Sequence, residues 1–290
     1  MIDLHLHSNC SDGVLSPEQV VKLAAERMIS TLALSDHDTV SGVSRAIGAA
    51  EKTGICVIPG VELSVCYKNY TDIHLLGYFI DIEAPELTSK LQEFAERRAN
   101  RNREIVGAVN QKLATEERIP LELGEVEKFA EGVLGRPHIA RALIARGYVQ
   151  NMEEAFKAYL VPCDIPKSYW PMEDALQTIK RIGGVAVLAH PTTITDDHTI
   201  LAGLIGSLQQ IGLDGIEVFN ALASEYDQLV LQKLAQAQGL LITAGSDFHG
   251  ISERDCIGKG RGGITFSDAL LPPLYQRAER RQTECLSTSP

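Results

Sequence analysis

The sequence predicts an α/β fold in which seven strands form a (β/α)7 barrel interrupted by a small helical domain. Three observations support this prediction. Seven short runs of aliphatic and β-branched residues recur along the 290 residues, amphipathic stretches of helical period separate most of them, and one long helical segment breaks the alternation. Alternating strands and helices are typical of parallel sheets with right-handed crossovers. A doubly wound open sheet is the competing architecture, and the number of strands favours the barrel.

The elements follow from local patterns. The first helix is expected after Ser16, an N-cap residue followed by Pro17 and Glu18. The predicted strands are Ile2–Leu6, Thr31–Leu34, Ile55–Ile58, Ile73–Ile80, Val185–Leu188, Gly215–Phe219 and Leu240–Thr243. Further helices are predicted over Ser41–Lys52, Met172–Ile182, Thr199–Ile211 and Ser224–Gln238, the last two ending at Gly212 and Gly239.

Residues 84–169 are too long for a loop and are predicted to form an inserted helical cap domain. Helical patterns cover Glu86–Leu113, Pro137–Arg146 and Met152–Leu160. The barrel is therefore assigned to residues 1–83 and 170–290. The insertion also holds the densest basic run of the chain, which comprises Arg97, Arg98, Arg101 and Arg103.

Composition narrows the class of protein. The formal net charge of −11 disfavours sequence-independent binding to duplex nucleic acid, which needs many basic contacts to phosphates. No apolar run approaches the ~18 residues of a membrane span, and no signal peptide is evident, so a cytoplasmic protein is expected. The six cysteines form no CxxC pair and are expected to be free thiols. No feature points to an obligate protein partner.

Imidazole and carboxylate groups gather at the end of nearly every predicted strand, where barrel enzymes build their sites. Alternate residues of a strand share a face, so His5 and His7 are expected to point together. The gathered residues are His5, His7, Asp12, Asp36, His37, Asp38, Glu62, His74, His190, Glu217, Asp247 and His249. Each has an ordinary alternative: a lone histidine is more often structural, Asp12 or Asp38 suits a helix N-cap, and Glu217 suits a buried partner of a basic residue.

Such a gathering is costly without a cation, because desolvation and like charges both oppose it. Histidine nitrogens with carboxylate oxygens and no cysteine suit Mn²⁺, Fe²⁺ or Zn²⁺. About nine candidate ligands exceed the needs of one ion. Two or three ions that share a bridging carboxylate are therefore expected, with Glu62 as the bridge, and such clusters favour in-line displacement at phosphorus.

The ordered motifs DLHLHSNCSDG, SDHD, PGVE, IHLLGY, AHP and GSDFH resemble those of the polymerase-and-histidinol-phosphatase (PHP) superfamily, and they run from Asp3 to His249. The resemblance implies a distorted seven-stranded barrel and a trinuclear metal site. It implies one ion on His5, His7, Glu62 and Asp247, a second on Glu62, His74 and His190, and a third on Asp12, His37 and His249.

The insertion refines this expectation. Its segments from Gly135 to Arg141 and from Lys157 to Leu160 are similar to the PHP branch that removes the 3′-phosphate from nucleoside 3′,5′-bisphosphates. Members of that branch are also implicated in 5′-to-3′ trimming of short RNA. The resemblance thus implies a small nucleotide or short oligonucleotide substrate and two or three divalent ions, with Mn²⁺ first. A phosphatase of another metabolite, such as histidinol phosphate, and a non-catalytic PHP module are the alternatives.

Roles follow for the remaining residues. The ions are expected to activate water and to neutralise charge on the phosphoryl oxygens, while Asp12, His37, His190 or His249 gives a proton to the leaving oxygen. A second phosphate needs a bidentate cation, for which Arg136 is the first candidate. Arg101, Arg103 and His138 are further candidates, and a solvated helix face is the alternative for the basic run. Cys10 is expected to be a bystander.

Overall fold

The computed structural model of the chain describes residues 1–129, 134–251 and 256–288. It divides into two compact units, one formed by Met1–Ser89 with Tyr169–Pro290 and the other by Lys90–Ser168. Each unit buries its own hydrophobic core.

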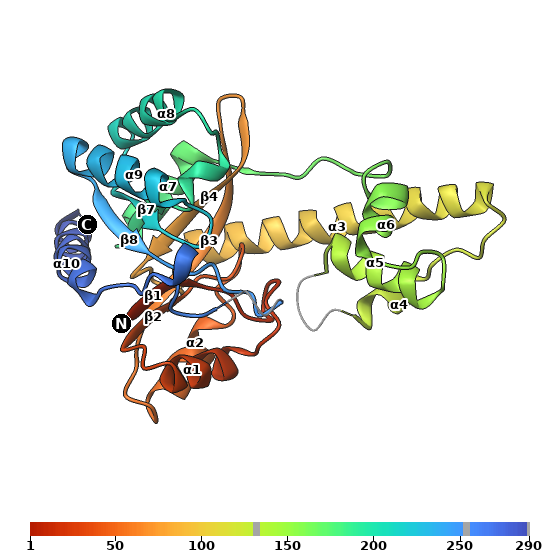
Figure 1. Cartoon of the computed structure of the whole chain (residues 1–290), viewed down its shortest axis with the longest axis horizontal. Coiled ribbons are helices and arrows are strands. Elements are labelled where there is room, and N and C mark those ends of the chain that lie inside the picture. Colours follow the sequence, from red (N-terminus) through yellow and green to blue (C-terminus); the bar gives the residue numbers. More distant parts are fainter. Residues whose placement is uncertain (130–133, 252–255, 289–290) are drawn as a thin grey trace. The chain divides into compact units, whose positions relative to one another are not determined.

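The first unit contains an α/β fold built on one mostly parallel sheet, as the alternation of strands and helices predicts. Along the sheet the order is β1-β2-β3-β4-β6-β7-β8, and β5 pairs with β3 outside this path. Figure 1 labels β1 to β4, β7 and β8. The strands are β1 (Ile2–Leu6), β2 (Thr31–Leu34), β3 (Cys56–Tyr67), β4 (Tyr70–Tyr78), β5 (Trp170–Pro171), β6 (Val185–Leu188), β7 (Gly215–Phe219) and β8 (Leu241–Ala244). The two-residue β5 lies outside the seven predicted runs, because it is too short to show a pattern.

The prediction of an all-parallel sheet is wrong at β4. This strand pairs antiparallel with both β3 and β6. Only Lys68 and Asn69 separate β3 from β4, and a parallel pair needs a crossover of a dozen or more residues. The predicted third strand also ends too early. β3 continues through Glu62 to Tyr67, so Glu62 lies inside a long strand rather than at its end.

Backbone hydrogen bonds connect the end of β1 to the segment after β8. The His7 amide donates to the Phe248 carbonyl at 3.0 Å, and the Asp247 amide donates to the His5 carbonyl at 3.0 Å. Close packing makes glycine necessary here, since a Cβ atom at Gly245 would lie 2.2 Å from Cβ of His5. The two ends of the strand order are therefore joined beside the residues that the sequence singles out.

Helices pack against the sheet. α1 (Pro17–Glu26) begins with the predicted N-cap, because the Ser16 side chain accepts from the Gln19 amide, and with α2 (Val43–Ala50) it shares a core with β1 and β2. Three further helices of this unit are α7 (Met172–Arg181), α8 (His198–Gln210) and α9 (Glu225–Gln238), the last of which ends at a left-handed Gly239 as predicted. Short 3₁₀ turns cover Pro191–Thr193, Arg261–Gly263 and Asp268–Leu270.

The polar segment near the C-terminus, for which the sequence predicts no element, forms α10 (Leu271–Thr288). Its sparse apolar residues Leu274 and Ala278 are buried in the core of the sheet. Its Arg281 lies 2.7 Å from the buried Asp214 carboxylate. Tertiary contacts of a few residues thus fix this helix, and its high overall polarity explains why the sequence pattern does not predict it.

The second unit is helical. It comprises residues of α3 (Pro85–Thr115), then α4 (Leu123–Glu127), α5 (Arg136–Ala145) and α6 (Met152–Ala155), which continues as a π-helical turn over Phe156–Leu160. Its core includes Ile105, Val109, Leu113, Ile139 and Leu143. None of the helices in the described part of the chain combines the length and apolarity needed to cross a bilayer. All six cysteines are free, as predicted.

Candidate metal centre

His5 of β1 and His7, which directly follows that strand, form the most deeply buried part of the site. His5 and His7 have no exposed surface, and both face the same carboxylates, as their spacing predicts. Nε2 of His5 lies 3.2 Å from Glu62 Oε1, and Nε2 of His7 lies 3.3 Å from Glu62 Oε2. Asp247, after β8, places its Oδ1 atom 3.4 Å and 3.2 Å from the same two nitrogens. These four residues form a first group that could hold a metal ion.

Glu62 lies at the centre of the whole cluster. Its Oε1 atom lies 3.1 Å from both His74 Nδ1 and His190 Nε2, and its Oε2 atom lies 2.9 Å from His37 Nδ1. One fully buried carboxylate thus faces five imidazoles from four parts of the sheet. A carboxylate in this position has the contacts expected of a bridge between ions.

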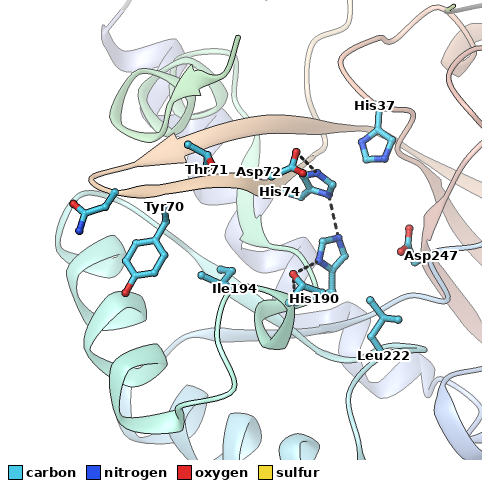
Figure 2. A pocket seen from close by; sticks show the side chains of 11 residues that line it. His37, Tyr70, Thr71, Asp72, His74, His190, Ile194, Leu222 and Asp247 are labelled. Carbon is cyan, nitrogen blue, oxygen red and sulfur yellow. Dashed lines mark hydrogen bonds and ion pairs between the residues drawn. The ribbon is translucent and has the colours of Figure 1, made fainter. Parts of the chain in front are cut away.

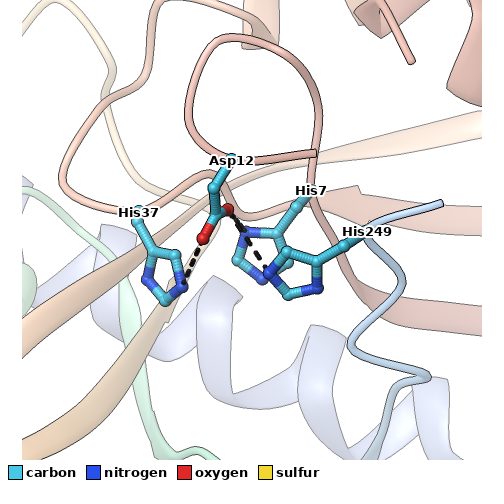
Figure 3. Close-up of side chains that lie close together, drawn as sticks. All are labelled: His7, Asp12, His37 and His249. Carbon is cyan, nitrogen blue, oxygen red and sulfur yellow. Dashed lines mark ion pairs between the residues drawn. The ribbon is translucent and has the colours of Figure 1, made fainter. Parts of the chain in front are cut away.

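A second group surrounds Asp12, which lies in the loop after β1. Figure 3 shows His7, His37 and His249 arranged around its carboxylate. Asp12 Oδ1 lies 3.3 Å from His249 Nε2 and 3.7 Å from His7 Nδ1, and Oδ2 lies 3.7 Å from His37 Nε2. His7 therefore belongs to two groups, through its two nitrogens.

A third group combines His37, Glu62 and His74. The resemblance implies His190 in place of His37 here. His190 nevertheless lies close, with its Nε2 atom 3.2 Å from His74 Nδ1 (Figure 2). The backbone of His190, and that of Asp38 and Asp247, has a positive φ, a conformation that concentrates at functional sites.

The buried nitrogen and oxygen atoms of this cluster provide a test of whether it suits metal ions. Among the described residues, His5 Nε2, His37 Nδ1, Glu62 Oε2 and both ring nitrogens of His7 are buried and make no hydrogen bond. Carboxylate and imidazole atoms lie close to each, but not in hydrogen-bonding geometry. Buried polar atoms without partners cost free energy, so these atoms fit an arrangement in which cations satisfy them.

The pKa shifts of the clustered residues also favour a site for cations. Burial lowers the pKa of His7, but the Asp247 and Glu62 carboxylates outweigh it and raise the pKa to about 10. Burial alone raises the pKa of Glu62, but His37, His5 and His74 hold that pKa well below its usual range. Without cations, protons on the imidazoles would balance the carboxylates. Metal binding at such a site displaces those protons.

A set of buried aspartates fixes the loops that carry the candidate ligands. Asp3 accepts from the Ser246 amide at 2.9 Å and from its hydroxyl at 2.6 Å, next to Asp247. Asp36 accepts from the Ser8 amide and hydroxyl, both at 2.7 Å, next to His7. In the same way, Asp38 accepts from the Ser64 amide at 2.8 Å and from its hydroxyl at 2.9 Å. Each aspartate therefore ties one ligand-bearing segment to a neighbour, and Asp38 does not cap a helix.

Glu217 of β7 supports the first group from behind. Its Oε1 atom lies 3.0 Å from Nδ1 of His5, and its Oε2 atom accepts from the His190 amide at 2.9 Å. A hydrogen bond at Nδ1 directs Nε2 of His5 toward Glu62 and Asp247. The sequence places Glu217 among the strand-end acids but leaves its partner open. Its partners are the His5 ring and the His190 amide rather than a lysine or an arginine.

The predicted anion-binding residues lie in the helical unit, where each contacts other parts of that unit. Arg136 Nη1 lies 3.0 Å from Asp164 Oδ2, and Arg101 Nη2 lies 2.7 Å from Asp164 Oδ1. Nδ1 of His138 accepts from the Gly135 amide at 2.9 Å, and Arg103 donates to Asn100 one turn away at 2.8 Å. The structure thus brings Arg101 and Arg136 together on one carboxylate, and leaves Arg103 on an exposed helix face.

The chain is similar to known proteins over most of its length. The PHP domain family matches residues 3–116. The 3′,5′-nucleoside bisphosphate phosphatase of Chromobacterium violaceum is 32% identical over 97% of each chain. The 5′-3′ exoribonuclease Rnm of Escherichia coli is 34% identical over 85% of this chain and 84% of its own.

Two solved structures are also similar. A Chromobacterium violaceum structure described as an amidohydrolase with bound sulfate and no metal superposes with a TM-score of 0.79, at 32% identity over 97% of this chain and 96% of its own. A Bifidobacterium adolescentis structure assigned as a metal-dependent phosphoesterase gives a TM-score of 0.80 at 24% identity over 95% and 96% of the two chains, which supports the fold alone.

Fold, site and relatives together define a phosphoesterase of the metal-dependent kind, with groups of histidines and carboxylates that could hold divalent ions. The chain belongs to the PHP family.

Proposed function

We propose that the chain hydrolyses the 3′-phosphate of nucleoside 3′,5′-bisphosphates, yielding the nucleoside 5′-monophosphate and phosphate. The observation that carries this proposal is the set of three overlapping ligand groups joined by Glu62 and His7, in a chain that matches a bisphosphate phosphatase over 97% of its length. The hydrogen bonds between the ends of β1 and β8 support describing the sheet as the distorted seven-stranded barrel of this family.

The nine predicted residues would hold two or three divalent ions, and the nitrogen and oxygen donor set is well suited to Mn²⁺. When bound, such ions polarise phosphoryl oxygens and lower the pKa of water. His5, His7, Glu62 and Asp247 would hold one ion. Glu62 and His74 with His37 or His190 would hold another, and Asp12, His37 and His249 with His7 a third.

The protein itself holds the reacting groups in place. The carboxylates of Asp3, Asp36, Asp38 and Glu217 fix the donors, so that little reorganisation is needed when the substrate binds. The proton for the leaving oxygen would come from Asp12, His37, His190 or His249. Their side chains are between 8% and 49% exposed and can exchange protons with solvent, whereas those of His5, His7 and Glu62 are fully buried.

The second phosphate is assigned to arginine. Arg136 and Arg101 present their guanidinium groups to the two oxygens of Asp164, which is the arrangement that an anion with two oxygens requires. We infer that Arg136 binds the phosphate that is not cleaved. Arg101, Arg103 and His138 are secondary candidates.

Steady-state assays would test the proposed function. The purified protein, loaded with Mn²⁺, is given adenosine 3′,5′-bisphosphate, histidinol phosphate and a short 5′-phosphorylated RNA. The bisphosphate should have the highest kcat/KM, with release of the 3′-phosphate. A higher kcat/KM for histidinol phosphate would overturn the proposal.

Stepwise 5′-to-3′ release of nucleotides from short RNA is the second candidate activity. It is favoured by the 34% identity to an exoribonuclease over 85% of the chain. Preferred turnover of the RNA in the same assay would support it over the phosphatase.

A further inference from the structure

A cavity of about 490 Å³ opens beside the metal centre within the first unit (Figure 2). Four of its lining residues are candidate ligands, namely His37, His74, His190 and Asp247. The rest come from the tip of the β3–β4 hairpin and from segments that follow β6 and β7. The ligand end is the place of the phosphate that is cleaved, so the other end faces the remainder of the substrate.

The far end is aromatic and aliphatic. Tyr70 from the hairpin and Ile194 after the 3₁₀ turn line it, and Asn69 and Thr71 add neutral polar groups, whereas Leu222 after β7 lies beside Asp247 in the view of Figure 2. In Figure 2, Tyr70 lies at the opposite end of the view from His37 and Asp247. This combination of apolar surface with a few polar groups is typical of small-molecule sites, and the cavity volume lies in their usual range.

Charge excludes a second phosphate from this end. In the part of the chain that the structure describes, no lysine or arginine lines the cavity, whereas Asp72 places a carboxylate there. The nearby Lys68 holds its ammonium group 4.9 Å from the centre of the Tyr67 ring. Among the described lining residues, a second phosphate at this end would therefore meet no lysine or arginine, and the Asp72 carboxylate, 3.9 Å from His74 Nε2, would oppose it.

We propose that this end of the cavity binds the nucleobase of the substrate, with Tyr70 as its stacking surface. The proposal rests on the proposed function, because it names the place of the base in the same substrate. A base is planar, uncharged and polar at its edge, and aromatic stacking suits every base alike. Asn69 can both donate to and accept from a base edge, and Asp72 can accept from an amino group or a ribose hydroxyl.

Matched substrates give a direct test. One is adenosine 3′,5′-bisphosphate, and the other is its analogue in which hydrogen replaces the base. Tyr70→Ala should raise KM for the nucleotide by about tenfold with little change in kcat, because a stacked base loses its platform. The same variant should leave the kinetics of the abasic analogue unchanged. Tyr70→Phe, which keeps the ring, should remain near the wild type.

Tyr226→Ala is the matched control, since Tyr226 is an exposed tyrosine of the same unit outside the cavity lining. It should change neither substrate's kinetics. Calorimetric titration with adenosine 5′-monophosphate provides a readout independent of turnover, in which Tyr70→Ala should weaken binding by about tenfold while Tyr226→Ala should not.

The outcomes separate the two proposals. The base-site proposal would be overturned if the wild type had equal kcat/KM for both substrates, or if Tyr70→Ala lowered kcat/KM equally for both. Neither result would contradict the proposed phosphatase activity. If the wild type hydrolyses neither substrate, the proposed function fails. In that case the titration still decides whether Tyr70 binds the base.

Discussion

The two units concentrate charge in opposite ways. In the metal centre, buried imidazole and carboxylate atoms of His5, His7, His37 and Glu62 lie close together without hydrogen bonds. In the helical unit, Arg136 and Arg101 share the Asp164 carboxylate and remain partly exposed. The first arrangement is costly until a cation completes it, whereas in the second each guanidinium group already has a carboxylate partner. Incomplete polar contacts thus identify the metal centre more clearly than charge density does.

Removal of a buried donor from the metal centre should have the largest effect on activity. His5→Ala should lower kcat/KM by about 10³-fold or more, because the first ligand group loses a donor in a preorganised site. Bound metal, measured by mass spectrometry of the purified protein, should fall, while circular dichroism stays unchanged. Asp247→Ala should behave alike.

His198→Ala is the matched control, since His198 pairs with Asp227 outside the cluster at 2.8 Å. It should keep its metal and its activity. Full activity of His5→Ala after treatment with a chelator would contradict the assignment of the metal centre.

The arginine cluster provides the next largest effect. Arg136→Ala should reduce kcat/KM for a nucleoside 3′,5′-bisphosphate by about thirty- to several-hundred-fold, the loss of one charge-assisted bidentate contact. Turnover of a small aryl phosphate, which needs only the metals, should change little. Kinetics with the two substrates in parallel measure this selectivity.

Arg146→Ala controls for a general loss of helical-unit stability, because Arg146 pairs with Glu125 in the same unit. It should affect neither substrate. Equal damage to both substrates by Arg136→Ala would mean that the Arg136–Asp164 contact supports only the fold. No damage to either would move the second phosphate site to Arg101, Arg103 or another residue.

A smaller effect is expected behind the metal centre. Glu217→Gln should weaken metal binding by about ten- to hundredfold, because an amide cannot accept from both His5 and the His190 amide. Metal titration measures the affinity, and NMR of the His5 ring nitrogens reports whether the proton stays on Nδ1. Glu225→Gln, at the exposed start of α9, is the control. An unchanged His5 spectrum with unchanged affinity would refute this positioning role.

Cys10 should show the smallest effect. It lies between His7 and Asp12, but its contacts are an amide hydrogen bond to Ser8 and an approach of Arg45 to its sulfur at 3.8 Å. Cys10→Ser should keep most of its activity and all of its metal. Loss of metal in this variant, measured as for His5→Ala, would bring a sulfur ligand into the centre.

The sequence predicts the clustering of histidines and carboxylates better than it predicts the strands that carry them. Strand-end histidines can be recognised in the sequence because imidazoles seldom cluster without a reason. Residues two apart in an extended segment, such as His5 and His7, share a face. The β3–β4 hairpin is missed, because Gly60 and Glu62 look like the end of a strand although Glu62 is buried within one. The helix α10 is missed as well, because contacts made by only a few of its residues fix it.

The aspartates that fix the ligand-bearing loops are harder to predict from the sequence. Asp3, Asp36 and Asp38 stand beside or near histidines in the motifs, and serines stand beside His7 and Asp247. Nothing in their spacing says which aspartate reaches which serine, because the partners are up to 243 residues apart. Likewise, the cavity beside Tyr70 exists only once the hairpin, the 3₁₀ turn and the segment after β7 meet.

The contacts of Asp3 have a consequence for the order in which the chain is completed. This residue near the start of the first strand binds the Ser246 and Gly258 amides, far along the sequence. During synthesis, β1 is made long before the segment that follows β8. Asp3 can therefore bind Ser246, and His5 and His7 can meet Asp247, only after that segment has left the ribosome. Contacts between residues so far apart in the sequence form slowly. The first group of His5, His7, Glu62 and Asp247 therefore cannot assemble before the segment after β8 has been made.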